Sequence, residues 1–61
     1  MKIRLIIKTD HQEIKFYDLD EENEVQIRIS DDFNNTQNIY IKKENLISLS
    51  KHIKYLLDKM G

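Results

Sequence analysis

Basic and aromatic side chains recur at alternate positions through the first two thirds of this 61-residue chain, where they could act together on one surface. In the segments 2–8, 13–17, 24–30 and 38–42, polar residues of this kind alternate with apolar ones. Cations neutralise phosphate groups, and tyrosine rings offer flat faces on which nucleotide bases stack. The candidate residues for such a site are Arg4, Lys15, Tyr17, Arg28, Tyr40 and Lys42.

The same residues also have a purely structural interpretation. If neighbouring strands pair, Arg4 comes opposite Tyr17 and Arg28 opposite Tyr40, so that each guanidinium lies over a ring. Such a surface could equally be solvated or be buried in an oligomer.

An acidic run at 18–24 supports a different kind of site. Its five carboxylates lie within seven residues: Asp18, Asp20, Glu21, Glu22 and Glu24. A dense run of negative charge can imitate a phosphate backbone and occupy a nucleic-acid channel on another protein. The ordinary alternative is a solvated hairpin loop. We therefore keep a protein-binding inhibitor as an alternative function.

Asp10, His11, Asp31 and Asp32 form a third candidate set, for metal-dependent DNA nicking. In a meander, the loops that carry them lie at the same end of the sheet, where carboxylates could hold a hard divalent ion. Asp is also favoured in hairpin loops for its local backbone hydrogen bonds, which is the competing explanation.

Four short strands must position these groups. Inward-facing apolar residues alternate in four segments, namely Ile3, Leu5 and Ile7; Ile14 and Phe16; Val25, Ile27 and Ile29; Ile39 and Ile41. Residues paired across antiparallel strands share a face, so each hairpin register can be tested against this pattern. The pattern predicts an antiparallel meander in strand order 1-2-3-4.

Loop lengths then give the expected pairs. A turn at Asp10-His11 pairs Ile7 with Ile14, Leu5 with Phe16 and Lys8 with Glu13. A loop at 19–22 pairs Phe16 with Val25 and Ile14 with Ile27, and a loop at 33–35 with a left-handed Asn pairs Ile29 with Ile39 and Ile27 with Ile41.

From about Glu44 the apolar period changes from two to nearly four. Six residues form one stripe about 100° wide: Leu46, Leu49, Ile53, Leu56, Leu57 and Met60. Asn45 is the expected N-cap and Gly61 the expected end of this helix. The predicted fold is therefore a single α+β domain over residues 1–61, ββββα, with the helix on one sheet face and the other face open.

This architecture resembles the positive-cofactor-four type of single-stranded DNA-binding fold, which also occurs among small phage proteins, including an anti-CRISPR inhibitor. The resemblance lies in topology over the whole chain, with the six basic and tyrosine residues standing where the family's DNA-contacting residues would be. It implies a homo-oligomer, a dimer or tetramer, and it implies that those residues contact single-stranded nucleic acid.

Size and composition limit the other function classes. One sheet and one helix rarely build the concave pocket that an enzyme needs, so catalysis is not expected and neither is a cofactor. Without cysteine, a domain this small has neither disulfides nor thiolate metal sites to support it, which favours self-association and a cytoplasmic location. No apolar run is long enough to span a membrane. We expect a homo-oligomeric binding module of phage or mobile-element type that engages nucleic acid, or a host protein that handles it, through the basic sheet face.

Overall fold

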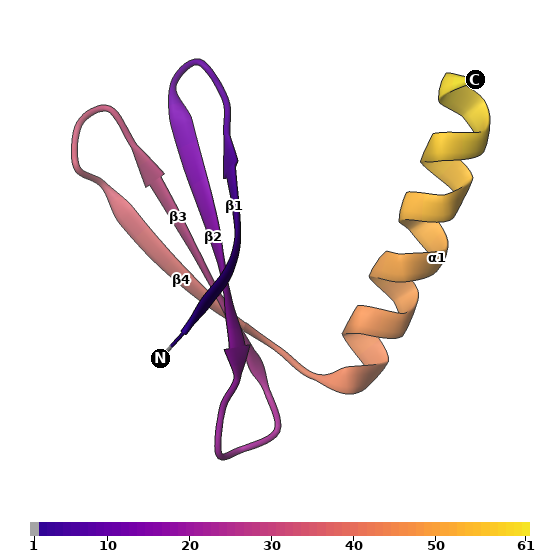
Figure 1. Ribbon diagram of the computed structural model, residues 1–61, viewed down its shortest axis with the longest axis horizontal. Helices are drawn as coiled ribbons and strands as arrows, with labels where there is room; N and C mark the ends of the chain where they lie inside the picture. Colours follow the sequence, from indigo (N-terminus) through magenta and orange to yellow (C-terminus); the bar gives the residue numbers. More distant parts are fainter. Residues whose placement is uncertain (1) are drawn as a thin grey trace.

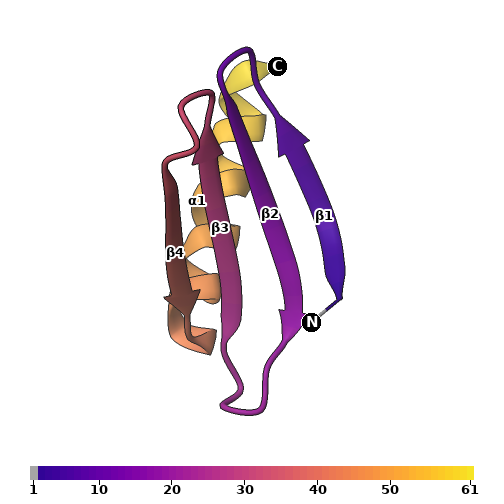
Figure 2. The ribbon, with the colours of Figure 1, turned by 90° about the vertical axis from the view of Figure 1, so that its left-hand side faces the viewer.

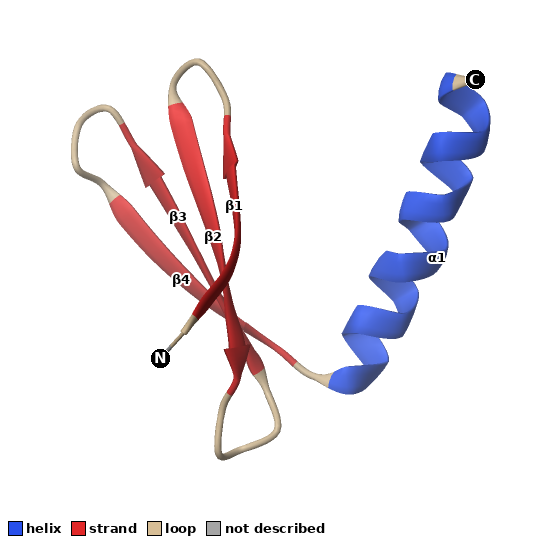
Figure 3. Ribbon diagram, viewed as in Figure 1, coloured by secondary structure: helices blue, strands red, loops and turns tan. Residues whose placement is uncertain are grey.

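The computed structural model describes residues 2–61 and contains one open sheet followed by one helix (Figures 1 and 3). The strands are β1 (Ile3–Lys8), β2 (Gln12–Leu19), β3 (Val25–Asp31) and β4 (Thr36–Ile41), and the helix is α1 (Lys43–Met60). The strands are antiparallel and lie in the order β1-β2-β3-β4. The predicted α+β fold class and the meander topology are confirmed.

The hairpin registers agree with the expectation in one case and differ in two. β1 and β2 pair as predicted, Ile7 with Ile14 and Leu5 with Phe16. β2 and β3 instead pair Ile14 with Ile29, and Phe16 with Ile27. Ile27 then pairs with Ile39, and Val25 with Ile41. Both corrections are shifts of two residues, so they leave the paired apolar residues of β2, β3 and β4 on their predicted face.

The two shifted hairpins are closed by a loop motif that occurs twice, and in the β2–β3 hairpin an irregularity between Phe16 and Leu19 changes the register by one residue. Asp20 Oδ1 accepts hydrogen bonds of 2.9 Å from the backbone N–H groups of Glu22 and Glu24, and Asn23 has φ 62°. In the next loop, Asp31 Oδ1 accepts from the N–H groups at positions 33 and 35, and the residue at 34 has φ 63°. An Asp followed three residues later by a left-handed Asn therefore closes both hairpins.

That second loop confirms one detail of the prediction. Asn34 is the left-handed residue, as expected for the loop between β3 and β4. Asp31 N–H also donates to the Asn35 carbonyl at 3.1 Å. The loop between this closing pair therefore consists of residues 32–34 and not of the predicted 33–35. The side chain of the first loop residue, and not the apolar alternation, decides where the ladder ends.

A β-bulge at the start of β1 changes a predicted contact. Ile3 pairs with Tyr17 and Leu5 with Phe16, so Arg4 is the extra residue and does not stand opposite Tyr17. Ile3 consequently shares the face of Tyr17 and not the apolar face. The expected pairing of Arg4 with Tyr17 is wrong because a bulge leaves no trace in the alternation of a six-residue strand.

One face of the sheet is apolar, and it is the face turned toward α1. Asp31 N–H donates toward β4, so the residues of the same parity in β3, Ile29, Ile27 and Val25, also direct their backbone groups at β4. For L-residues on a strand running as β3 does, this directs their side chains to the side on which α1 lies (Figure 2). The apolar face comprises Leu5, Ile7, Ile14, Phe16, Val25, Ile27, Ile29, Ile39 and Ile41.

The helix begins earlier than predicted and without a side-chain cap. Lys42, in an extended conformation with φ −89° and ψ 169°, is the N-cap, and Asn45 lies inside the first turn. The N–H groups of Asn45 and Leu46 both donate to the Lys42 carbonyl at 3.1 Å, so backbone hydrogen bonds start the helix at Lys42. Gly61, with φ 79°, ends the helix as predicted.

α1 stands away from the sheet over most of its length (Figure 1). Within residues 2–61, the main contacts between elements are those between neighbouring strands. Among the described residues of the helix, Leu46 alone is half-buried and the others are exposed. The predicted stripe is therefore present on the side of the apolar face, but it leaves most of that face uncovered. No helix within residues 2–61 has the combination of length and apolar content that a bilayer crossing needs.

Candidate nucleic-acid interface

The face of the sheet that points away from α1 carries the polar side chains of all four strands. We call this surface the polar face. The registers place on it Ile3, Ile6, Lys8, Glu13, Lys15, Tyr17, Gln26, Arg28, Ser30, Thr36, Asn38 and Tyr40. Three of these side chains are cationic and one is acidic, although the whole chain has a formal net charge of −1. The polar face is therefore a local excess of positive charge on a slightly acidic protein.

Arg28 occupies the centre of the polar face. Its guanidinium lies 5.6 Å from the centroid of the Tyr17 ring, a cation–π contact. Its Nε donates to Asn38 Oδ1 at 3.1 Å, and Gln26 Nε2 donates to the same oxygen at 3.2 Å. Gln26 is only 5% exposed, so this hydrogen-bond network is partly enclosed within the polar face. The predicted pairing of Arg28 with Tyr40 is wrong, because the register shift brings Asn38 opposite Arg28.

Lys15 stands directly opposite Arg28 on the neighbouring strand. Like charges in this position repel each other across the ladder. Glu13 compensates only in part, with its two carboxylate oxygens 3.6 Å from Lys8 Nζ and 3.4 Å from Lys15 Nζ. Within residues 2–61, Arg28 takes part in none of the ion pairs. Lys15 and Arg28 therefore stand side by side, and the nearby Glu13 carboxylate is shared between Lys15 and Lys8.

The two tyrosines differ in how available their rings are. Tyr17 is half-buried beneath Arg28, whereas Tyr40 is 55% exposed and pairs with Gln26 near the end of the sheet that carries the acidic loop. Tyr40 is thus the ring with a free face for stacking, and Tyr17 serves mainly to orient the guanidinium.

Two predicted residues lie at the margin of the polar face. Arg4 is the bulge residue of β1, and Lys42 follows the end of β4 as the N-cap of α1. Lys15, Tyr17 and Arg28 are brought together at the centre, with Tyr40 at one end. Sequence reasoning missed Asn38, whose alternation with Tyr40 placed it on this face but whose hydrogen bond to Arg28 depends on the register.

The acidic loop is more ordered than a string of free carboxylates. Asp18 Oδ1 accepts from Leu19 N–H at 2.9 Å, and Asp20 is occupied by the loop motif. Glu21 and Glu22 are exposed, and Glu24 is half-buried. Together with Tyr40, the loop borders an open hollow of about 670 Å³, lined by Leu19, Asp20, Glu21, Glu22 and Tyr40.

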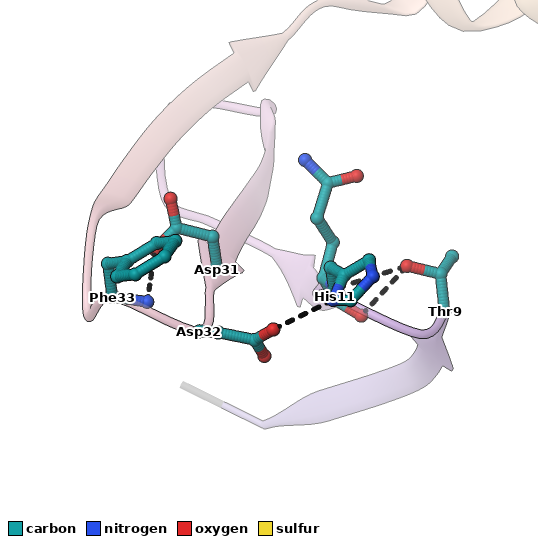
Figure 4. Close-up of polar contacts among 6 residues, drawn as sticks. Thr9, His11, Asp31, Asp32 and Phe33 are labelled. Carbon is teal, nitrogen blue, oxygen red and sulfur yellow. Dashed lines mark hydrogen bonds and ion pairs between the residues drawn. The ribbon is translucent and has the colours of Figure 1, made fainter.

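The opposite end of the sheet brings two of the four candidate metal ligands together (Figure 4). His11 Nδ1 lies 3.0 Å from Asp32 Oδ2, which joins the β1–β2 loop to the β3–β4 loop. Asp31 is turned into its own loop, where hydrogen bonds from the Asn35 side chain and backbone lower the pKa of its carboxyl. Within residues 2–61, no group of three or more His, Cys, Asp or Glu side chains could hold a metal ion.

Comparisons with known proteins add no family to this description. No protein-family model matches the chain, and neither a curated protein nor a solved structure matches it. The functional argument therefore depends on the geometry of the polar face.

Proposed function

We propose that the protein binds single-stranded nucleic acid on its polar face. The observation that carries this proposal is the Lys15–Arg28 pair: two cations directly opposed across the ladder, of which Lys15 shares the Glu13 carboxylate with Lys8 and Arg28 has no ion pair within residues 2–61. Such a pair lowers the stability of an isolated sheet and becomes favourable when an anion lies between the two groups. Phosphate groups in a flexible strand can meet both cations at once.

The surroundings of the pair fit a strand better than a duplex. Phosphates would contact Lys8, Lys15 and Arg28, and a base would stack on the exposed ring of Tyr40. The faces of bases are free in a single strand, whereas in a duplex they are covered by neighbouring base pairs. The acidic loop at 18–24 limits the site at the Tyr40 end by repelling phosphates.

The direct test is binding of a fluorescent 20-mer single strand, followed by anisotropy at low and moderate salt. Lys15→Glu should abolish binding at moderate salt, since it removes one cation and places a carboxylate next to Arg28. Lys51→Glu is the matched control, because it changes the net charge equally on the exposed surface of α1. Duplex of the same sequence should bind more weakly.

Two results would contradict the proposal. One is a wild-type protein that leaves the single strand free at low salt. The other is an equal loss of binding in Lys15→Glu and Lys51→Glu, which would mean that only the net charge matters.

A second candidate function rests on the hollow beside the acidic loop. Leu19, 57% exposed, and Tyr40 supply apolar walls, while Glu21 and Glu22 supply negative charge. A lysine or arginine side chain of a partner protein fits this combination, which is the inhibitor alternative in the form that the geometry favours. Neutralising both glutamates to Gln should weaken such a complex without weakening nucleic-acid binding. The phage or mobile-element origin and the cytoplasmic location stay predictions.

A further inference from the structure

The apolar face of the sheet and the apolar stripe of α1 do not pack against each other over most of the helix. The sheet wall consists of the nine apolar-face residues, and the helix wall is the stripe from Leu46 to Met60. The helix wall is exposed apart from the half-buried Leu46, with Leu57 63% exposed. On the sheet wall Leu5, Ile7 and Ile39 are exposed, and five of the other six residues are half-buried. Ile27 is the one buried hydrophobic residue within residues 2–61. The chain therefore contains both halves of a core that it does not close.

The dimensions of the chain give the size of the missing contact. Its accessible surface is 5389 Å², whereas a folded monomer of this mass exposes about 4,200 Å². Its Cα radius of gyration is 13.1 Å, whereas about 10.5 Å is typical of a compact chain of this length. Closing the core would thus remove about 1,200 Å² from solvent per chain.

The connection between sheet and helix explains why the chain does not close on itself. Lys42 is the single residue between β4 and α1, and its extended φ and ψ direct the helix away from the sheet. Connections between packed elements commonly have two to six residues. A short, extended hinge of this kind favours exchange of an element between two chains.

We propose that a second copy of this chain covers both apolar walls, with its α1 against the apolar face of the first copy and the first α1 against the apolar face of the second. The two walls are complementary because each chain carries a sheet and a stripe of matching apolar character, so one two-fold axis satisfies both. The interface would bury about 2,400 Å² in total, within the range of obligate homodimers. This inference goes beyond the proposed function and does not depend on it.

Sedimentation equilibrium over a range of protein concentrations tests the mass. The wild-type protein should have twice the chain mass of 7.4 kDa. Leu57→Lys places a charge in the stripe of both copies and should raise the dimer dissociation constant by at least about 100-fold. Tyr55→Lys, on the opposite side of the helix, is the matched control and should remain dimeric, since Tyr55 lies about 160° from Leu57 around the helix axis. A monomeric wild-type protein would overturn the proposal.

Cross-linking tests the exchange itself. Because the sequence contains no cysteine, an introduced cysteine is the only thiol that can react in each chain. Gln37 pairs with Ile29 on the apolar face, its neighbour Thr36 pairs with Ser30 on the polar face, and both are exposed. Ser50 borders the stripe of α1. A tagged Ser50→Cys chain mixed with a Gln37→Cys chain should give a bismaleimide-linked heterodimer, and the same mixture with Thr36→Cys should give at least about tenfold less.

These outcomes separate exchange from other dimers. A dimeric mass with no cross-link from Gln37→Cys above the Thr36→Cys level would overturn the proposal, because the copies would then meet through another surface. Neither measurement uses nucleic acid, so failure of the dimer and failure of nucleic-acid binding are observed independently.

Discussion

The salt dependence of nucleic-acid binding can be worked out from the polar face. For single strands, each neutralised phosphate contributes about −0.7 to the slope of log K against log salt concentration. Lys8, Lys15 and Arg28 are three cations within one face, so the expected slope is about −2 and a rise from 50 to 200 mM salt weakens binding about 20-fold.

Lys15→Gln removes one of these contacts. The slope should fall by about 0.7 in magnitude, and the affinity at about 0.1 M salt should fall about fivefold. Glu13→Gln should act in the opposite direction, since the Glu13 carboxylate lies 3.4 Å from Lys15 Nζ and 3.6 Å from Lys8 Nζ and competes with phosphate for both cations. The opposite signs separate an electrostatic effect from a general loss of folding.

Anisotropy titrations of a labelled 20-mer at four salt concentrations measure both quantities. Lys51→Gln serves as the control and should leave slope and affinity unchanged, because Lys51 is an exposed residue of α1 and not of the sheet. The reasoning is refuted if Lys15→Gln leaves the slope unaltered, or if Glu13→Gln weakens binding as much as Lys15→Gln does.

Three further predictions concern the ring of Tyr40, the loop between β3 and β4, and the stability of the protein at low pH. Tyr40→Leu should weaken single-strand binding by about 1–3 kcal/mol in the same titration, while the thermal midpoint by circular dichroism changes little, because the ring is 55% exposed. Asn34→Ala should lower the free energy of unfolding in urea by about 1 kcal/mol, and Asn34→Gly should not, since φ at this position is 63°. The pKa of Asp31 is below its ordinary value, chiefly through the hydrogen bond from the Asn35 side chain, so its contribution to stability is present above about pH 4 and is lost as the pH falls through the lowered pKa. NMR titration of Asp31 should show this lowered pKa in the wild type, and Asn35→Ala should return it toward the ordinary value.

The alternation of apolar residues predicted the strands and their faces, because the side chains that a sheet buries on one face occupy every second position of a strand. A shift of two residues leaves every side chain on the same face, so the pattern does not distinguish the pair Ile14–Ile27 from the observed pair Ile14–Ile29. The information that decides between them lies in the loop and in the irregularity between Phe16 and Leu19. Asp20 and Asp31, each followed three residues later by Asn, are the signal that sequence reasoning passed over.

The sequence predicts on which face of the sheet each site residue lies, because the face depends only on alternate positions, but it does not predict the contact partners of that residue. Lys15, Tyr17 and Arg28 were placed on one face correctly, but the partners of the two arginines depend on a bulge and on a register. Arg28 therefore lies over Tyr17, and Arg4 lies at the margin. The helical period likewise predicts an apolar stripe but not how closely that stripe packs on the sheet, since the packing depends on the one-residue connection at Lys42.

The two proposals assign opposite faces of one sheet, which makes them separable by experiment. If the apolar face is enclosed by a second copy, the polar face is what the dimer presents outward, once on each side. Lys15→Gln should then weaken nucleic-acid binding without changing the mass. Leu57→Lys should change the mass and should weaken binding mainly for strands long enough to reach both polar faces, because only those gain from two linked sites. An equal effect of Leu57→Lys on short and long strands would mean that the stripe also supports the fold of the polar face, and the independence of the two faces would be refuted.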